Sequence, residues 1–140
     1  MSVTLTHLAT ATLKLGAPVQ IPNTPRGTRL VVELLGGQWE GERLKATMKN
    51  VAAADWALIT PDGTLFIEVR CTLETHDGAF IQVSYQGRGA IGPEGLGAVI
   101  AAPTFETGDP RYAWLNKVQA IGRGQKTSDD TLVYDFYEAS

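Results

Sequence analysis

Apolar and polar residues alternate along the middle of the chain. From Thr64 to Thr75 every second residue, Leu65 through Leu73, is apolar, while the residues between them are mostly polar or charged. A period of two is typical of a β-strand that turns one face to the core. Residues 76–78 have the sequence His-Asp-Gly, which predicts a three-residue hairpin loop with the glycine in the left-handed conformation.

The hairpin loop fixes which residues of its two strands face each other. A one-residue slip would mix the apolar and polar faces, so the register is well specified. Residues 60–63, Thr-Pro-Asp-Gly, predict a second hairpin that adds a strand at Ala54–Ile59. Together the two loops place Asp55, Val69 and Tyr85 in one row on the apolar face. The other expected pairs are Leu73 with Ile81, Cys71 with Val83, Ile59 with Leu65 and Ala57 with Ile67.

The rest of the chain predicts further short strands rather than helices. No segment has capped apolar spacing of helical period, and Gly, Pro, Asn or Asp bound the apolar stretches. Residues 36–41 predict a sharp corner, the glycine-rich residues 89–103 a long loop over one barrel end, and residues 122–130 a polar connection. We therefore expect an all-β fold, a small antiparallel barrel of about eight or more strands, in a single domain of residues 1–140. The remaining strands are expected at residues 4–15, 28–35, 43–50, 112–121 and 131–138.

Composition and the first residues of the chain limit which binding partners and which cellular compartment we expect. The formal net charge is -3, so the chain offers no basic field for the phosphates of nucleic acid. The first residues contain no signal peptide and no apolar run of membrane-spanning length, so we expect a cytoplasmic protein without nucleic-acid or membrane partners. The single cysteine, Cys71, cannot form an internal disulfide and lies among alternating apolar residues, so we expect a buried thiol.

Sequence motifs for several catalytic classes are absent. The chain has no nucleophile elbow, phosphate-binding glycine loop, dinucleotide fingerprint or zinc-protease motif. No Cys and His residues are spaced as zinc ligands, and the two histidines, His7 and His76, lie far apart in the sequence. We therefore expect no metal, flavin or nicotinamide cofactor, and chemistry carried by carboxylate and phenol groups.

Asp55 and Tyr85 are the first candidates for such chemistry. Neighbouring strands lie about 4.8 Å apart, so these two side chains would be separated by about 10 Å, which accommodates a small substrate. Apolar surroundings raise the pKa of a carboxylate and suit it to proton transfer near neutral pH. The alternative is that Asp55 ends a strand and caps the turn at residues 51–54. The sequence leaves both interpretations open.

Aromatic and hydrogen-bonding residues gather in residues 103–116. Tyr112, Trp114 and Asn116 share one face by period two, and the apolar residues that follow at the same spacing mark this face as buried. A buried Asn116 amide needs partners from the backbone, from water or from a ligand. These three side chains therefore either contact a ligand or pack in the core.

The opposite face of the paired strands carries Trp56, Leu58 and Phe66. Because a core takes only one face, these three must be covered by another segment or by a second subunit, and we expect a homodimer or higher homo-oligomer. Arg70 shares this face. It either forms a cross-strand ion pair or holds an anion in the lumen.

Several short motifs follow one another in a characteristic order. They are Thr24-Pro25-Arg26-Gly27-Thr28-Arg29, Gly36-Gly37 with Glu40-Gly41, Asp55-Trp56, Arg70 with Asp77-Gly78 and Gly87, and Phe105-Glu106-Thr107 followed by Asp109-Pro110-Arg111-Tyr112-Ala113-Trp114-Leu115-Asn116. This order resembles the domain-of-unknown-function family 3237. The resemblance implies a calycin-like β-barrel that often self-associates and has no established general activity. Residues 52–54 are alanines where such proteins tend to carry glycines, so the local turn differs.

We interpret the chain as a cofactor-independent lyase or isomerase that acts on a small, largely apolar or aromatic metabolite inside the barrel. Asp55 is the expected general acid or base, and Tyr85 and Tyr112 are the expected donors of protons or hydrogen bonds. Two alternatives remain: a non-catalytic barrel that binds a small hydrophobic ligand, and a structural subunit whose barrel is packed solid. The expected substrate-binding residues are Arg70, Glu106, Trp114 and Asn116.

Overall fold

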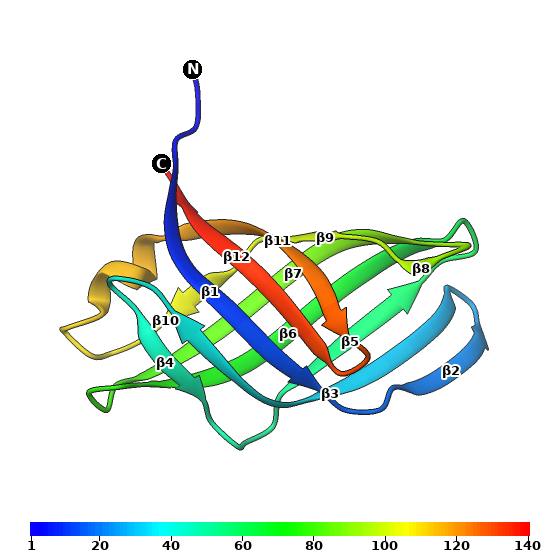
Figure 1. Ribbon diagram of the computed structural model, residues 1–140, viewed down its shortest axis with the longest axis horizontal. Helices are drawn as coiled ribbons and strands as arrows, with labels where there is room; N and C mark the ends of the chain where they lie inside the picture. The colour runs from blue at the N-terminus through cyan, green and yellow to red at the C-terminus, as the bar shows by residue number, and fades with distance from the viewer.

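Twelve β-strands and one short 3-10 helix make up the computed structural model, which describes all residues 1–140 (Figure 1). The elements are β1 (Leu5–Leu15), β2 (Val19–Thr24), β3 (Gly27–Glu40), β4 (Lys45–Met48), β5 (Ala54–Ile59), β6 (Thr64–Thr75), β7 (Phe80–Gly92), β8 (Gly95–Leu96), β9 (Val99–Ala101), β10 (Thr104–Glu106), the helix η1 (Ala113–Lys117), β11 (Gln119–Ser128) and β12 (Thr131–Ala139). No helix in the chain has the length and apolar character that a membrane crossing requires.

The strands close into an antiparallel barrel of eight staves. Seven staves follow the order β6, β7, β9, β11, β12, β1 and β3, and β10 continues the β9 stave along β7. The eighth stave is shared, because β4 joins β3 to β6 at one end of the barrel and β5 joins the same two strands at the other. The predicted all-β barrel is confirmed.

Both predicted hairpins form with the predicted register. The bounds of β5 and β6 are those predicted, and Asp55, Val69 and Tyr85 lie opposite one another across β5, β6 and β7. Gly63 and Gly78 have φ values of 83° and 91° in the two loops, a conformation that favours glycine. The other confirmed pairs are Leu73 with Ile81, Cys71 with Val83 and Ile59 with Leu65.

The strand predicted at residues 112–121 is wrong in its first half, which is the 3-10 helix η1. Leu115 of this helix is buried, as are Tyr112 directly before it and Val118 directly after it, so the buried positions fall at intervals of three rather than two. A 3-10 helix has three residues per turn, so these side chains stack on one side of it. Only the stretch from Gln119 onward is a strand, and it continues as β11.

The polar connection predicted at residues 122–130 is also wrong, because β11 runs on to Ser128. After Ala120, the inward positions of this strand are Gly122 and Gly124, which leave no apolar alternation to detect in the mispredicted segment. A Cβ atom on Gly122 would lie 2.4 Å from the Phe136 ring, and one on Gly124 would lie 2.4 Å from the Tyr134 ring. The two glycines therefore make room for aromatic rings of the neighbouring strand.

Two further segments that were predicted to be irregular form strands in the structure. Residues 89–103, expected as a loop, hold the end of β7, then β8 and β9. Residues 36–41, expected as a corner, lie mostly within β3, whose register against β1 shifts between Lys14 and Leu15. Such a bulge bends a strand without ending it. The short strand β2 has no counterpart in the prediction.

Aromatic side chains fill one half of the barrel interior. Trp39 and Phe136 stack with their ring centroids 5.0 Å apart, and Phe136 stacks on Tyr134 at 4.7 Å. Phe105 meets the Trp39 ring edge-on at 6.2 Å. These offset and edge-on contacts are the arrangements that aromatic rings prefer. The barrel is therefore solid at this end.

Arginine side chains cover the outer aromatic residues of β5 and β6. The Arg70 guanidinium lies 4.9 Å from the centroid of the Trp56 ring, and the Arg88 guanidinium lies 4.0 Å from that of Phe66. Leu58, between them, is only 2% exposed. The chain thus covers this face with its own cation–π contacts, and the face does not need a second subunit.

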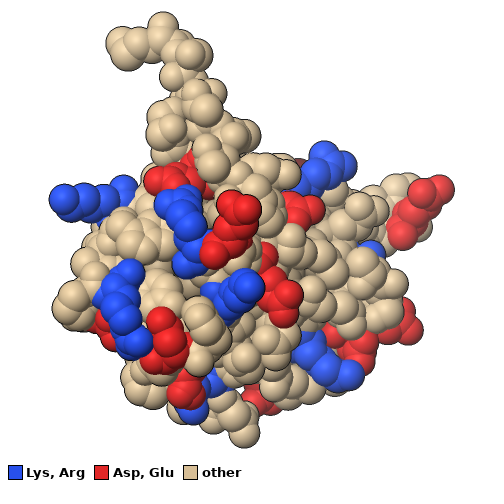
Figure 2. Space-filling model, turned by 60° about the vertical axis from the view of Figure 1, so that its left-hand side comes forward, with Lys and Arg blue, Asp and Glu red and all other residues tan.

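Self-association stays a prediction and finds a different basis in the N-terminal arm. The first three residues extend away from the barrel (Figures 1 and 2), and the apolar side chains of Val3 and Leu5 are 70% and 53% exposed. We expect a dimer in which a second copy covers these side chains. Light scattering at micromolar concentration should give twice the 15.0 kDa chain mass. Changing Val3 and Leu5 to Ser should reduce it to one chain mass, and a monomeric native protein would contradict the expectation.

Candidate functional site

A cavity of about 230 Å³ occupies the half of the barrel that the aromatic stack leaves free. Fifteen of its 20 lining residues are hydrophobic, which suits an apolar ligand. Its mouth is formed by the β1–β2 connection, by Ile91 and Leu96 of the β7–β8 hairpin, and by Lys126 and Asp129 of the β11–β12 hairpin. The segment 89–103 therefore does lie over one end of the barrel. Its first part is the β7–β8 hairpin, and its later part is strand β9 of the barrel wall.

Asp55 of β5 extends into this cavity at a break in the barrel wall. Strands β5 and β6 pair at Asp55 with Val69 and again at Leu58 with Phe66, but not between these points. The predicted pair of Ala57 with Ile67 is therefore missing. At the break, the backbone N–H of Glu68 donates to Oδ1 of Asp55 at 3.0 Å. The carboxylate takes the place of a main-chain acceptor, which also fixes its orientation.

Burial controls the protonation of Asp55. Loss of solvent raises the pKa of its carboxyl group to about 6, and this effect outweighs the hydrogen bond from Glu68, which lowers the pKa. The negative charge of Glu68 raises it further. At neutral pH the group is mainly ionised, but it gains and loses its proton within a unit or so of physiological pH. Such a pKa suits both a general base and a general acid.

Two phenols share the cavity with Asp55. Burial, then the neighbouring Tyr134, raises the pKa of Tyr85 well above its usual value, and burial followed by the charge of Asp55 raises that of Tyr134. Both phenols therefore remain protonated donors. Their rings meet edge-on, with centroids 5.7 Å apart, and neither hydroxyl has a hydrogen-bond partner within the chain. Both hydroxyls are thus available to a ligand.

Tyr134 is the residue that sequence reasoning missed. The signal was present in the predicted strand of residues 131–138, where Leu132, Tyr134 and Phe136 alternate with polar or smaller residues. That pattern indicates that Tyr134 faces the interior. Its position beside Tyr85 depends on the closure of β12 against β11 and β1, which no local pattern encodes.

Tyr112, the second expected donor, lies at the opposite end of the barrel. Its hydroxyl donates to Oδ1 of Asp77 at 2.7 Å in the β6–β7 loop. Along β6, this loop begins seven positions after Val69, or roughly 23 Å at the rise of a strand. Tyr112 therefore does not join Asp55 and Tyr85.

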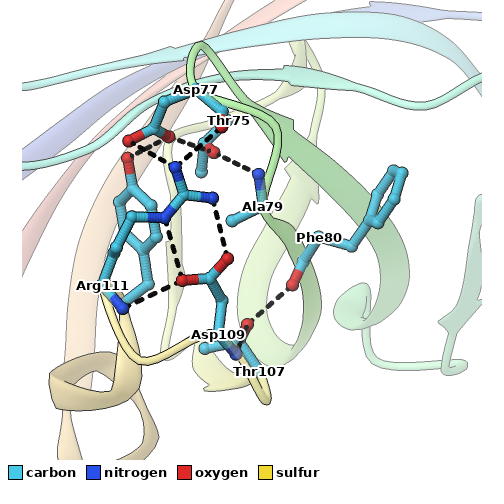
Figure 3. A network of polar contacts seen from close by, with 8 residues as sticks. Thr75, Asp77, Ala79, Phe80, Thr107, Asp109 and Arg111 are labelled. Atoms are coloured by element: carbon cyan, nitrogen blue, oxygen red, sulfur yellow. Dashed lines mark hydrogen bonds and ion pairs between the residues drawn. The ribbon is translucent and has the colours of Figure 1, made fainter.

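A polar clasp, formed by Thr75, Asp77, Asp109, Arg111 and Tyr112, ties two loops together at this end (Figure 3). Arg111 binds both carboxylate oxygens of Asp109, at 3.0 and 2.8 Å, and donates to the main-chain oxygen of Asp77 at 2.9 Å. Hydrogen bonds from Thr75 and Tyr112 lower the pKa of Asp77 to about 2. The clasp uses its own donors and acceptors on one another, which indicates a structural role.

Asn116 and Trp114 also serve the packing of this end. The exposed Asn116 side chain accepts from the N–H of Thr107 at 2.8 Å and donates to the carbonyl of the same residue at 2.9 Å. Trp114 is half-buried beneath Arg43, whose guanidinium lies 4.4 Å from the ring centroid. Neither side chain lines the cavity.

The last two expected ligand contacts, Glu106 and Arg70, lie on the outer surface. Glu106 is exposed on β10, opposite Gln82 of β7. Arg70 is exposed on β6, where it covers Trp56 and forms no ion pair. Of the residues predicted for the site, the structure brings together only Asp55 and Tyr85.

The acidic, histidine and cysteine side chains of the chain do not gather into a cluster of metal ligands. The chain has no group of three or more His, Cys, Asp or Glu side chains placed to hold a metal ion. Cys71 is buried, as expected, and burial raises the pKa of its thiol to about 12. A thiol with this pKa is not a nucleophile at neutral pH.

Replacing Tyr112 by Phe tests the structural role of the clasp. The change removes one hydrogen bond to Asp77, so we expect a loss of about 1 kcal/mol in the free energy of unfolding, measured by urea titration. Tyr137→Phe is a matched control, because the Tyr137 hydroxyl forms no hydrogen bond in the chain. Equal effects of the two changes would argue against the clasp.

Replacing Asp55 by Asn tests the raised pKa. Between pH 4 and 6 the folded protein holds a proton that the unfolded chain has released, so native stability falls as the pH rises through this window. Asn keeps an acceptor for Glu68 but carries no charge. We therefore expect Asp55→Asn to be more stable than the native protein by about 2 kcal/mol at pH 8, and to lose this advantage near pH 4.

Urea unfolding at both pH values measures this difference, and Asp129→Asn at the exposed mouth should show none. If Asp55 instead acts only as a cap, its replacement should cost about 1 kcal/mol at either pH.

Known proteins are similar to this chain in sequence and in fold. A UPF0311 protein of Rhodopseudomonas palustris is 26% identical over 91% of both chains, and one of Bradyrhizobium diazoefficiens is 24% identical over the same shares. A solved beta-barrel-like protein of Acinetobacter baumannii superposes with a TM-score of 0.89 at 27% identity, covering 100% of this chain and 98% of its own. An enzyme of Penicillium herquei gives a TM-score of 0.79 at 23% identity, covering 100% of this chain and 96% of its own.

The family model agrees with these likenesses and with the motif order in the sequence. It extends over nearly the whole barrel, from the N-terminal arm to the end of β12. The chain belongs to the family of proteins of unknown function DUF3237, whose model matches residues 3–139.

Proposed function

We propose that the protein is a cofactor-independent lyase or isomerase that acts on a small, largely apolar or aromatic metabolite within the barrel. The observation that carries this proposal is the Asp55 carboxyl group, with a pKa of about 6, beside two protonated phenols in an apolar cavity. A carboxyl group that titrates near neutral pH in such a place is more typical of a functional site than of a core.

The three side chains divide the reaction between them. Asp55 removes a proton from a substrate carbon with its second carboxylate oxygen, because the first is held by Glu68. The electron pair of the broken C–H bond moves toward an adjoining carbonyl, whose oxygen becomes negatively charged. Tyr85 and Tyr134 donate hydrogen bonds to that oxygen, which lowers the barrier to its formation.

The second half of the reaction distinguishes an isomerase from a lyase. In an isomerase, protonated Asp55 returns its proton to a different atom of the substrate. In a lyase, the electron pair expels a leaving group from the neighbouring carbon, and Asp55 protonates that group. Both routes balance without an oxidant, a metal or a second substrate, and both use the same carboxyl group in two protonation states.

The shape of the cavity defines the substrate class. A volume of about 230 Å³ is below the usual range for drug-sized ligands, so the substrate is small. Its apolar part lies against the aliphatic lining, and polar substituents remain near Lys126 and Asp129 at the mouth. The Penicillium herquei neighbour is an enzyme, which is consistent with catalysis in a barrel of this shape.

A binding barrel is the second candidate, because most of the cavity lining is hydrophobic. A carrier needs the apolar cavity but not a titrating carboxyl group. Proton exchange with solvent therefore separates the two functions.

The test is deuterium incorporation in heavy water. Small aromatic and aliphatic carbonyl compounds are first selected for binding, as judged by shifts of the Tyr85 and Tyr134 ring signals in NMR. The compounds that bind are then incubated with the protein, and the uptake of deuterium at carbon is measured. We expect catalysed uptake, reduced by a factor of about 10² to 10⁴ in Asp55→Asn. Tyr85→Phe should reduce it by about 10².

Tyr112→Phe is the matched control and should leave uptake unchanged, because Tyr112 lies at the other end of the barrel. Compounds that bind in the cavity but exchange no faster than in buffer would favour the binding barrel. Full activity in Asp55→Asn would contradict the mechanism.

A further inference from the structure

A second hollow lies on the outside of the barrel wall, over β5, β6 and β7. It has a volume of about 240 Å³, and its lining includes Arg26, Arg29 and Arg88. Glu68 is the one carboxylate among its lining residues, so the hollow carries a positive charge in a chain of net charge -3. We call it the arginine pocket.

None of the three arginines forms an ion pair in the chain. Outside the pocket, Arg43 lies 2.6 Å from Glu138 and Arg111 lies 2.8 Å from Asp109, whereas Arg70 and Arg123 form no ion pair either. Figure 2 shows one face of the molecule, on which Lys and Arg side chains are interspersed with Asp and Glu side chains. The arginine pocket is distinguished by the three unpaired arginines that line one hollow.

Two of these guanidinium groups are held in place by the wall. Arg88 lies over the Phe66 ring at 4.0 Å and donates Nη1–H to the carbonyl of Gly87 at 2.9 Å. Arg29 donates Nη1–H to the carbonyl of Trp56 at 3.0 Å, where β5 and β6 part. Each guanidinium uses one nitrogen for these bonds and keeps its other N–H groups free. Fixed forks of free N–H groups are what oxyanions bind.

We propose that the arginine pocket is a binding site for a small oxyanion, the phosphate or carboxylate head group of a small molecule. The hollow is smaller than a typical drug-sized site, so it accepts a head group rather than a large ligand. The three arginines supply charge-assisted hydrogen bonds, and Gln86 supplies a neutral side-chain amide at the rim. The site lies outside the barrel cavity and does not depend on the proposed reaction.

Titration with inorganic phosphate and with acetate, at constant ionic strength, tests the site. The Nε–H signals of Arg29 and Arg88 in NMR report the binding. We expect saturable binding of at least one anion in the millimolar range, and the tighter of the two identifies the head group. Arg26→Gln and Arg88→Gln should each weaken it about tenfold. Arg26 is exposed in a turn and its side chain forms no hydrogen bond, so its removal should leave the fold intact.

Arg123→Gln, on the outer face of β11, is the control and should leave the affinity unchanged. Equal weakening by Arg123→Gln would show attraction to overall charge and would overturn the proposal. So would the absence of saturation with both anions. Binding of polyglutamate without binding of either small anion would also overturn it, in favour of a docking surface for an acidic protein.

Discussion

The interior of an eight-staved barrel is only just wide enough for its own inward side chains, and this limit governs the whole molecule. Where the inward residues are large, as with Trp39 and Phe136, the barrel is solid. Neighbouring inward positions must then be glycine, which explains Gly122 and Gly124. Where the inward residues are aliphatic, the same width leaves a cavity. The size of successive inward side chains thus decides which half of the barrel can hold a ligand.

Within that cavity, one local break in the hydrogen-bonded wall gives Asp55 its character. A regular ladder between β5 and β6 would bind the Glu68 N–H to a main-chain oxygen. Because the two strands part, the Asp55 carboxylate accepts this N–H instead and is held in the apolar interior. Desolvation then raises its pKa to about 6. The gap between β5 and β6 therefore has two effects. It makes the Asp55 carboxylate the acceptor for the Glu68 N–H group, and it places a carboxyl group with a raised pKa in the interior.

The gap in pairing between β5 and β6 also affects the outer side of the barrel wall. Arg29 donates to the Trp56 carbonyl there, and Arg70 and Arg88 lie over aromatic rings that would otherwise be exposed. Guanidinium groups suit this position because their planar faces cover aromatic carbon while their edges still bind polar groups. Covering the wall with arginines leaves cations without carboxylate partners, and the arginine pocket results from this arrangement.

Features that depend on neighbours along the chain could be predicted from the sequence alone. Alternation from Thr64 to Thr75 and two glycine-containing loops specified the register that aligns Asp55 with Tyr85, because a short loop transmits its geometry directly to both strands. Other features depend on contacts between distant parts of the chain. Tyr134 reaches the same cavity only because β12 closes against β11 and β1, and Tyr112 leaves the expected face because its segment forms a 3-10 helix that packs at intervals of three. Most of strand β11 could not be predicted from its own residues, because its inward positions include Gly122 and Gly124, which carry no apolar side chain. The apolar groups that fill this space are the rings of Tyr134 and Phe136 on the neighbouring strand β12. Whether a barrel is solid or hollow depends on which distant residues meet across its axis, and that is settled only when the last stave closes.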